Sequence, residues 1–242
     1  MIMKKKIFAA LMTVVLCVSA YGTTLFAAES KAGMTDVLTE SIKEEVIQNG
    51  EWRANSDGSY SFILKKEDNS LSRSSVTNNT SINYTLIPIT EEAKANLDKA
   101  YQVARSGGSR TLTDSDAAGC VSAYSIINWT DKTENAREYV YLTSVSGGYS
   151  AEGSGSYISS GVSVSAHKVT VGQSGFTTNG YKSQNKTFDI GTSARSFSYG
   201  SSNWSGFLPV ESSSGSSNMG AYYVITLKRG TSTWACEISN NY

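Results

Sequence analysis

Short segments of alternating apolar and polar residues, separated by Gly, Ser and Asn, fill the last 123 residues of this chain. In residues 219–228, the alternation puts Met219, Tyr223 and Leu227 on one face, as in a strand that buries one side. Six or more such segments within about 120 residues favour an antiparallel β-sandwich, because a parallel sheet needs longer crossovers. We therefore expect residues 120–242 to form an antiparallel β-sandwich domain with Ser/Gly-rich strands.

The expected strands of this domain follow one another closely. They are residues 120–130, 138–145, 161–171, 186–190, 195–199, 219–228 and 231–238. Within the third segment the apolar phase shifts near His167-Lys168, which predicts a bulge and places His167 in that bulge or at the surface. The region holds 26 Ser but only 15 charged residues, so we expect serine on the outer faces to solvate the strands.

Residues 29–119 have a different composition and predict a small α+β region. A helix is expected from Thr35 to Asn49, because apolar residues recur every four positions within it. Asp57-Gly58 predicts a hairpin between two short strands. A further strand is expected at 82–89, and a second helix from Thr90, since two glutamates occupy its first turn. The chain as a whole is therefore predicted to be mainly β.

Residues 1–28 have the pattern of a secretory signal peptide. Lys4, Lys5 and Lys6 precede an apolar run, and the small residues Ala27 and Ala28 mark the expected cleavage site. The sequence thus predicts a protein secreted to the outside or the surface of the cell. The strand-rich, Ser/Gly/Tyr-rich composition of residues 120–242 resembles that of many exported Gram-positive proteins. The alternative is a retained membrane anchor of about 20 residues. After cleavage, no later segment is apolar enough to form a stable membrane span.

Cleavage would leave two cysteines, Cys120 and Cys236. In an exported protein these are expected to pair, because oxidising compartments favour disulfides. The bond would close a loop of 116 residues and stabilise the fold by roughly 4–5 kcal/mol in chain-entropy models. The alternative is a pair of buried free thiols.

Charge and motif content exclude several chemistries. The chain has 21 basic and 21 acidic residues, which gives no electrostatic footprint for nucleic acid. One His and three Cys are too few for a Cys/His zinc cluster, and residues 114–119 lack the later ligands of a calcium loop. No G-x-S-x-G elbow is present. We therefore predict no catalytic residues, no metal and no cofactor, and a protein that is not an enzyme.

Aromatic residues in loop-like stretches are the candidate binding residues. Tyr199, Trp204 and Phe207 lie in a small-residue segment, and Tyr149 and Tyr157 flank a second one. Exposed aromatic rings on loops can stack on sugar rings or enter a membrane interface. The alternative is that Trp204 and Phe207 close one end of the sandwich.

Three functions remain open from the sequence. The first is a secreted, non-enzymatic binding protein for a carbohydrate, a cell surface or a protein. The second is a bacteriocin-like or pore-forming toxin in which residues 149–171 refold as a membrane hairpin. The third is an extracellular hydrolase that uses paired carboxylates. In addition, the flexible basic stretch 105–110 would allow a protease to remove residues 29–119 as a pro-region.

Overall fold

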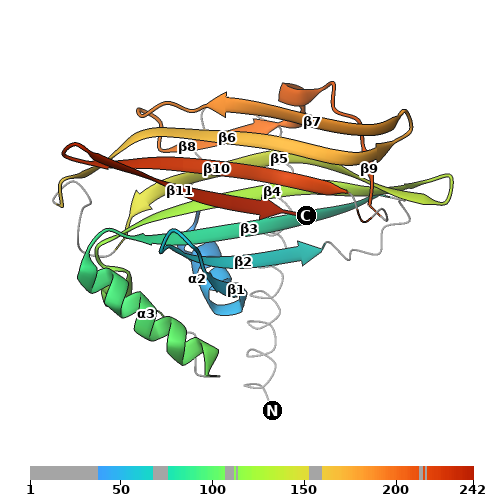
Figure 1. Cartoon of the computed structure of the whole chain (residues 1–242). Coiled ribbons are helices and arrows are strands. Elements are labelled where there is room, and N and C mark those ends of the chain that lie inside the picture. Colours follow the sequence, from blue (N-terminus) through green and yellow to red (C-terminus); the bar gives the residue numbers. More distant parts are fainter. Residues whose placement is uncertain are drawn as a thin grey trace, which may run out of the picture. The chain divides into compact units, whose positions relative to one another are not determined.

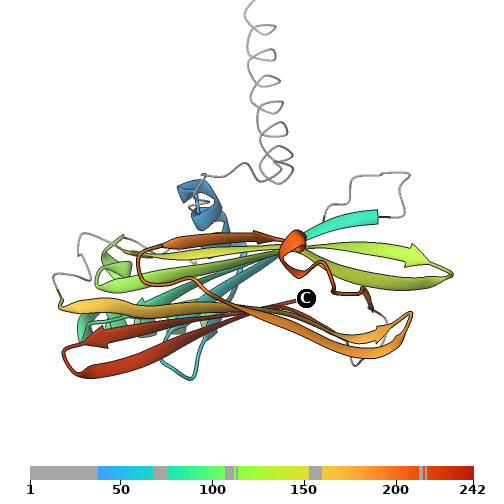
Figure 2. The ribbon, with the colours of Figure 1, turned by 90° about the horizontal axis from the view of Figure 1, so that it is seen from above.

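The computed structural model describes residues 38–67, 76–106, 112, 114–152, 160–212, 215 and 217–242. These residues belong to one compact unit that extends from Thr35 to Tyr242. The predicted signal peptide and Tyr157 lie outside the described residues. The described part of the chain is mainly β, as predicted, and its two antiparallel sheets pack as a sandwich (Figures 1 and 2).

The larger sheet, sheet A, has seven strands in the order β1-β2-β3-β4-β5-β8, with β9 also paired to β5. Its strands are β1 (Glu51–Ala54), β2 (Tyr60–Glu67), β3 (Val76–Pro88), β4 (Cys120–Glu134), β5 (Arg137–Ala151), β8 (Ser196–Gly200) and β9 (Val210–Glu211). The expected hairpin at Asp57-Gly58 joins β1 to β2, and Gly58 has the positive φ of 83° that such a turn requires.

The smaller sheet, sheet B, has four strands in the order β11-β10-β6-β7. They are β6 (Val162–Thr177), β7 (Gly180–Asp189), β10 (Asn218–Arg229) and β11 (Ser232–Asn241). Edge strand β11 contacts β3 and β4 of sheet A. Sheet A extends past β11, so that β2 and β1 reach beyond the edge of sheet B (Figure 1).

Two helices pack on the face of sheet A that is turned away from sheet B. They are α2 (Glu40–Asn49) and α3 (Glu91–Arg105). The described residues also include two shorter helical elements, α4 (Asp114–Ala117) and the 3-10 helix η1 (Ser201–Trp204). Helix α3 begins where predicted, because the Thr90 hydroxyl accepts a hydrogen bond of 3.1 Å from the Ala93 N–H. Helix α2 begins at Glu40, later than the expected start at Thr35.

The alternation of β3 and β4 produces two hydrophobic cores. The inter-sheet core contains Val121, Ala123 and Ile127 of β4 together with the inward residues of sheet B. The helix-side core contains Tyr84 and Leu86 of β3, which pack with α2 and α3. Successive residues of a strand point to opposite faces, so a single strand contributes to both cores.

The expected boundary at residue 119/120 does not separate two units. Strand β3 pairs with β4 continuously, from Val76 opposite Lys132 to Pro88 opposite Cys120. Strands β1, β2 and β3 therefore belong to the same sheet as β4 and β5 of the expected sandwich domain. Local composition differs between the two regions, but long-range strand pairing joins them.

The phase shift in β6 is a bulge, two residues before its expected position. Ala166 pairs with Thr226 and Val164 pairs with Leu227, so that Ser165 is the extra residue. After the bulge, His167 points inward and is only 1% exposed, which corrects the expectation of a surface histidine. Its Nδ1 lies 3.1 Å from the Tyr223 hydroxyl, and burial lowers the pKa of its imidazole.

The predicted disulfide is wrong, because Cys120 and Cys236 are both free. Cys120 lies in the helix-side core and Cys236 in the inter-sheet core, on opposite faces of sheet A. Burial raises the pKa of Cys120 to about 12 and also raises that of Cys236. Both thiols therefore act as small apolar core residues.

Candidate functional site

The inward face of β2 and β3 is polar where a sandwich normally buries apolar side chains. Ser61 of β2 and Ser81, Asn83 and Thr85 of β3 are all buried, at 4% exposure or less. Within residues 120–242, Ser122, Ser125 and Ser146 are also buried, at 8% exposure or less, so the expectation that serine lies on outer faces there is only partly correct. A buried polar row of this kind is stable only when its members are hydrogen-bonded.

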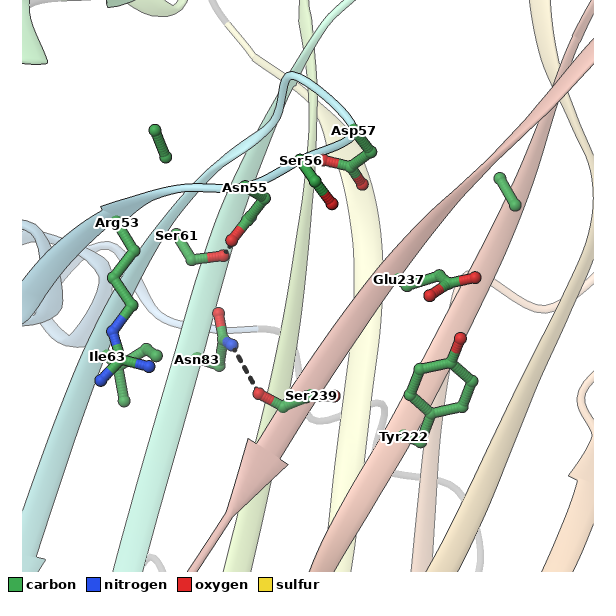
Figure 3. A pocket seen from close by; sticks show the side chains of 12 residues that line it. Arg53, Asn55, Ser56, Asp57, Ser61, Ile63, Asn83, Tyr222, Glu237 and Ser239 are labelled. Carbon is green, nitrogen blue, oxygen red and sulfur yellow. Dashed lines mark hydrogen bonds between the residues drawn. The ribbon is translucent and has the colours of Figure 1, made fainter.

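A chain of hydrogen bonds runs along this polar face. The Asn55 side chain donates to Ser61 Oγ at 2.9 Å, and Ser61 Oγ lies 2.8 Å from Thr85 Oγ1. Thr85 Oγ1 donates to Asn83 Oδ1 at 3.0 Å. Asn83 Nδ2 in turn donates to the Ser239 carbonyl at 3.1 Å (Figure 3). These hydrogen bonds connect the β1–β2 hairpin of sheet A to β11 of sheet B and fix the two relative to each other.

Asn240 of β11 makes a second connection between the sheets. Its Oδ1 accepts a hydrogen bond of 2.6 Å from Ser81 Oγ. Its Nδ2 donates to the carbonyls of Ser81 and Ser125, at 3.0 and 2.7 Å. Asn240 is 1% exposed, so these bonds form away from water and fix the register of β11 over β3 and β4.

A cleft of about 660 Å³ lies between the β1–β2 hairpin and the outward faces of β10 and β11, and we call it the polar cleft (Figure 3). Its volume falls within the usual range for small-molecule sites. It is lined by Arg53, Ala54, Asn55, Ser56, Asp57, Ser61, Ile63, Asn83, Tyr222, Ala235, Glu237 and Ser239.

Tyr222 and Glu237 form the sheet B wall of the polar cleft. A hydrogen bond to Glu237 raises the pKa of the Tyr222 hydroxyl to about 12. In Figure 3 the hydroxyl points toward Glu237. Tyr222 is 39% exposed, so one part of its ring remains open to a ligand.

The hairpin wall carries two charged groups that local contacts hold in place. Arg53 Nε and Nη2 each donate to a Glu51 carboxylate oxygen at 2.9 Å. Asp57 Oδ1 accepts from the Ser59 N–H at 2.9 Å and from its hydroxyl at 2.6 Å. These contacts reduce the side-chain freedom that binding would otherwise remove.

The predicted aromatic residues 199, 204 and 207 are brought together at the edge of the inter-sheet core. Trp204 is 2% exposed and its Nε1 donates to the Leu142 carbonyl at 3.0 Å. Tyr199 stacks on Phe188, with 4.2 Å between ring centroids, and Phe207 is half-buried beside Trp204. Most of this aromatic surface is used for packing.

The other predicted aromatics lie elsewhere. Tyr149 is 6% exposed and its ring meets His167 edge-on at 5.4 Å. Tyr157 lies outside the described residues. Asn83, Tyr222 and Glu237 were not among the predicted site residues. The alternation of β3 did indicate Asn83, because a strand with apolar residues on one face and Asn, Ser and Thr on the other lies between a core and a polar site.

Within the described ranges, no group of three or more His, Cys, Asp and Glu side chains is arranged to hold a metal ion. In the same ranges, no helix combines the length and the apolar character needed to cross a membrane. No protein-family model, curated protein or solved structure matches this chain.

Proposed function

We propose that this chain is a secreted, non-enzymatic binding protein that takes a carbohydrate in the polar cleft. The observation that carries the proposal is the hydrogen-bonded polar face of β2 and β3, which occupies a position where an apolar core would be more stable. Secretion is inferred from the signal-like residues 1–28.

The chemistry of the lining suits a polyhydroxylated ligand. A sugar hydroxyl both donates and accepts, and Asn55, Ser61 and Ser239 offer both kinds of partner within one cleft. The Tyr222 ring supplies apolar area against which the C–H face of a sugar can pack. Glu237, held by Tyr222, is an acceptor for two neighbouring hydroxyls.

Two observations favour binding over hydrolysis. The Asp57 carboxylate accepts hydrogen bonds from Ser59, and Glu237 is bonded to Tyr222, so a neighbouring side chain positions each acid. His167, the single histidine of the chain, is buried in the inter-sheet core. Neither the two acids nor His167 therefore supplies the pair of a proton-donating acid and a free base or nucleophile that glycoside hydrolysis needs.

The toxin alternative has less support. Residues 149–171 include the end of β5 and the start of β6, which belong to different sheets. Strand β6 is paired with β10 on one side and with β7 on the other. Refolding into a membrane hairpin would have to break both sets of hydrogen bonds.

Glycan binding by matched variants tests the proposal. The full chain would be screened against immobilised plant, bacterial and animal polysaccharides, followed by calorimetry on any that bind. Tyr222→Ala and Glu237→Gln are expected to weaken binding about tenfold or more. Tyr181→Ala, which removes a tyrosine 53% exposed on β7, serves as the matched control and is expected to bind normally. Binding that survives both cleft changes would contradict the proposed site.

A further inference from the structure

A second cavity, of about 330 Å³, lies between α2 and the face of sheet A that is turned away from sheet B. We call it the helix-side cavity. It is lined by Leu38, Glu40, Lys43, Tyr84, Ser122, Tyr124, Tyr149, Ser150, Glu152, Arg195 and Ser196. No lining residue is shared with the polar cleft.

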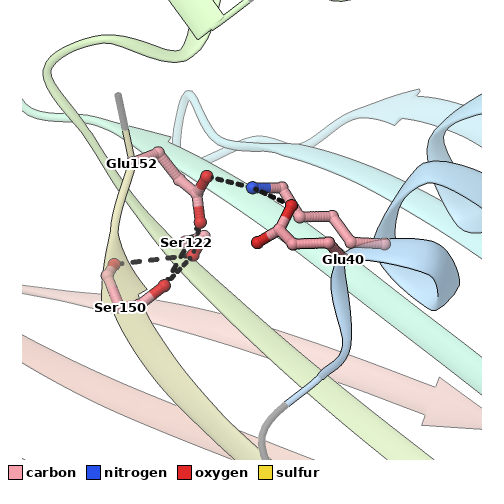
Figure 4. Close-up of polar contacts among 5 residues, drawn as sticks. Glu40, Ser122, Ser150 and Glu152 are labelled. Atoms are coloured by element: carbon pink, nitrogen blue, oxygen red, sulfur yellow. Dashed lines mark hydrogen bonds and ion pairs between the residues drawn. The ribbon is translucent and has the colours of Figure 1, made fainter. Parts of the chain in front are cut away.

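The charges deep in this cavity already balance each other. Glu152 is 8% exposed and forms an ion pair with Lys43 of α2. Its other oxygen accepts hydrogen bonds from Ser122 at 2.6 Å and from Ser150 at 3.2 Å (Figure 4). Burial alone would raise the pKa of Glu152, but these hydrogen bonds and the Lys43 charge hold it below its ordinary value. The ion pair therefore needs no charge from a ligand.

The aromatic wall of the cavity contains one unused polar group. Tyr84 and Tyr124 are buried, at 2% and 7% exposure, and both line the cavity. The Tyr84 hydroxyl lies close to Ser122 and Glu152, but it stands in full hydrogen-bonding geometry to neither of them. A buried hydroxyl without a partner is unfavourable, and a ligand acceptor would satisfy it.

The exposed part of the lining carries one acid and one cation: Glu40, whose carboxylate lies 3.7 Å from Lys43 Nζ, and Arg195. Arg195 is exposed, and among the described residues its guanidinium forms no hydrogen bond or ion pair. A guanidinium presents a fork of donors that matches a carboxylate or sulfonate. An apolar interior and a cation at the rim together suit a molecule with an apolar body and an anionic head.

We propose that the helix-side cavity is a second ligand site, which binds a small amphiphilic organic anion. The apolar body lies against the Tyr84 and Tyr124 rings, an oxygen of the ligand accepts from the Tyr84 hydroxyl, and the anionic group pairs with Arg195. This site goes beyond the proposed carbohydrate cleft and does not depend on it, because the two lie on different faces of sheet A.

Fluorescence titration of the full chain with anilinonaphthalene sulfonate tests this site, with decanoate as a competing anion and decanol as its uncharged counterpart. Decanoate is expected to displace the probe, and decanol to do so about tenfold less effectively. Arg195→Gln is expected to weaken probe and decanoate binding about tenfold, and Tyr84→Phe, which removes only the hydroxyl, several-fold. Lys182→Ala, a change to an exposed cation on β7, is expected to have no effect.

Two outcomes would overturn the proposal. One is an absence of saturable probe binding at roughly millimolar concentration. The other is equal affinity of the wild-type chain and Arg195→Gln. Near-ultraviolet circular dichroism of each variant shows that probe fluorescence reports the folded state. Tyr222→Ala is expected to leave probe binding unchanged, so this site and the carbohydrate cleft can fail separately.

Discussion

The side-chain amide of Asn83 donates a hydrogen bond of 3.1 Å to the carbonyl oxygen of Ser239, a residue 156 positions later in the chain. The bond crosses from the middle of sheet A to the edge strand of sheet B, at the floor of the polar cleft. At this point the two sheets are joined by a side-chain hydrogen bond, where apolar side chains would normally pack. The cleft and the sandwich are therefore stabilised by the same polar residues.

Replacing Asn240 by alanine is expected to destabilise the fold by about 2–4 kcal/mol. The change leaves the Ser81 hydroxyl and the Ser81 and Ser125 carbonyls without their partner in a buried position. Urea unfolding measures the loss. Asn241→Ala, at the exposed neighbouring position, is expected to change stability by less than about 0.5 kcal/mol. Equal effects of the two changes would contradict a structural role for the Asn240 bonds.

Glu152→Gln is expected to lower stability by about 1–3 kcal/mol near neutral pH, because Lys43 loses its buried partner and keeps only the exposed Glu40 carboxylate at 3.7 Å. The folded-state pKa of Glu152 lies below its ordinary value of 4.5. Its contribution is therefore present above that value and is lost as the pH falls through the folded-state pKa. Urea unfolding of both proteins over the acidic range should show their difference shrinking. A difference that stays constant with pH would argue against this ion pair.

The single histidine is expected to titrate below its ordinary pKa of 6.5 in the folded protein. Between the two values the unfolded chain binds a proton that the folded chain does not, so His167 makes stability fall as the pH drops below about 6.5. Proton NMR of the one imidazole gives the folded pKa directly. A midpoint at or above 6.5 would show that the ring is solvated or paired with an acid.

Cys120 and Cys236 are expected to be unreactive thiols in the folded protein. Their raised pKa values keep them protonated, and both are 1% exposed. Alkylation followed by peptide mapping should label neither residue before unfolding and both after it, without reductant. If the two residues escape labelling after unfolding until a reductant is added, they form a disulfide.

Removal of residues 29–119 is expected to give an insoluble product. It would strip β3 from β4 and expose the helix-side face of sheet A, including Tyr124 and Ile126. An unpaired edge strand next to apolar surface promotes aggregation. Expression of a chain that begins at Cys120 checks this. A soluble, cooperatively unfolding product would favour the pro-region hypothesis.

Much of the secondary structure could be predicted from local sequence. Thr90 marks the start of α3, Asp57-Gly58 forms the turn of a hairpin, and the phase shift in 161–171 is a bulge. The candidate site was largely missed. The predicted site consisted of aromatic residues in loops, but Trp204 is buried in the core, and the polar cleft is built from strand residues such as Asn83 and Tyr222.

The sequence by itself determined the features that depend on neighbouring residues: the antiparallel β class, the strand segments, the α3 cap and the hairpin turn. Tertiary structure alone decided the features that depend on which face is buried and what lies opposite. Pairing of β3 with β4 joins β1–β3 to the sandwich, Cys120 and Cys236 lie in separate cores, and the Asn83 amide bonds to the Ser239 carbonyl. Propensity and turn chemistry act over a few residues, whereas pairing between distant strands depends on the packing of the whole fold.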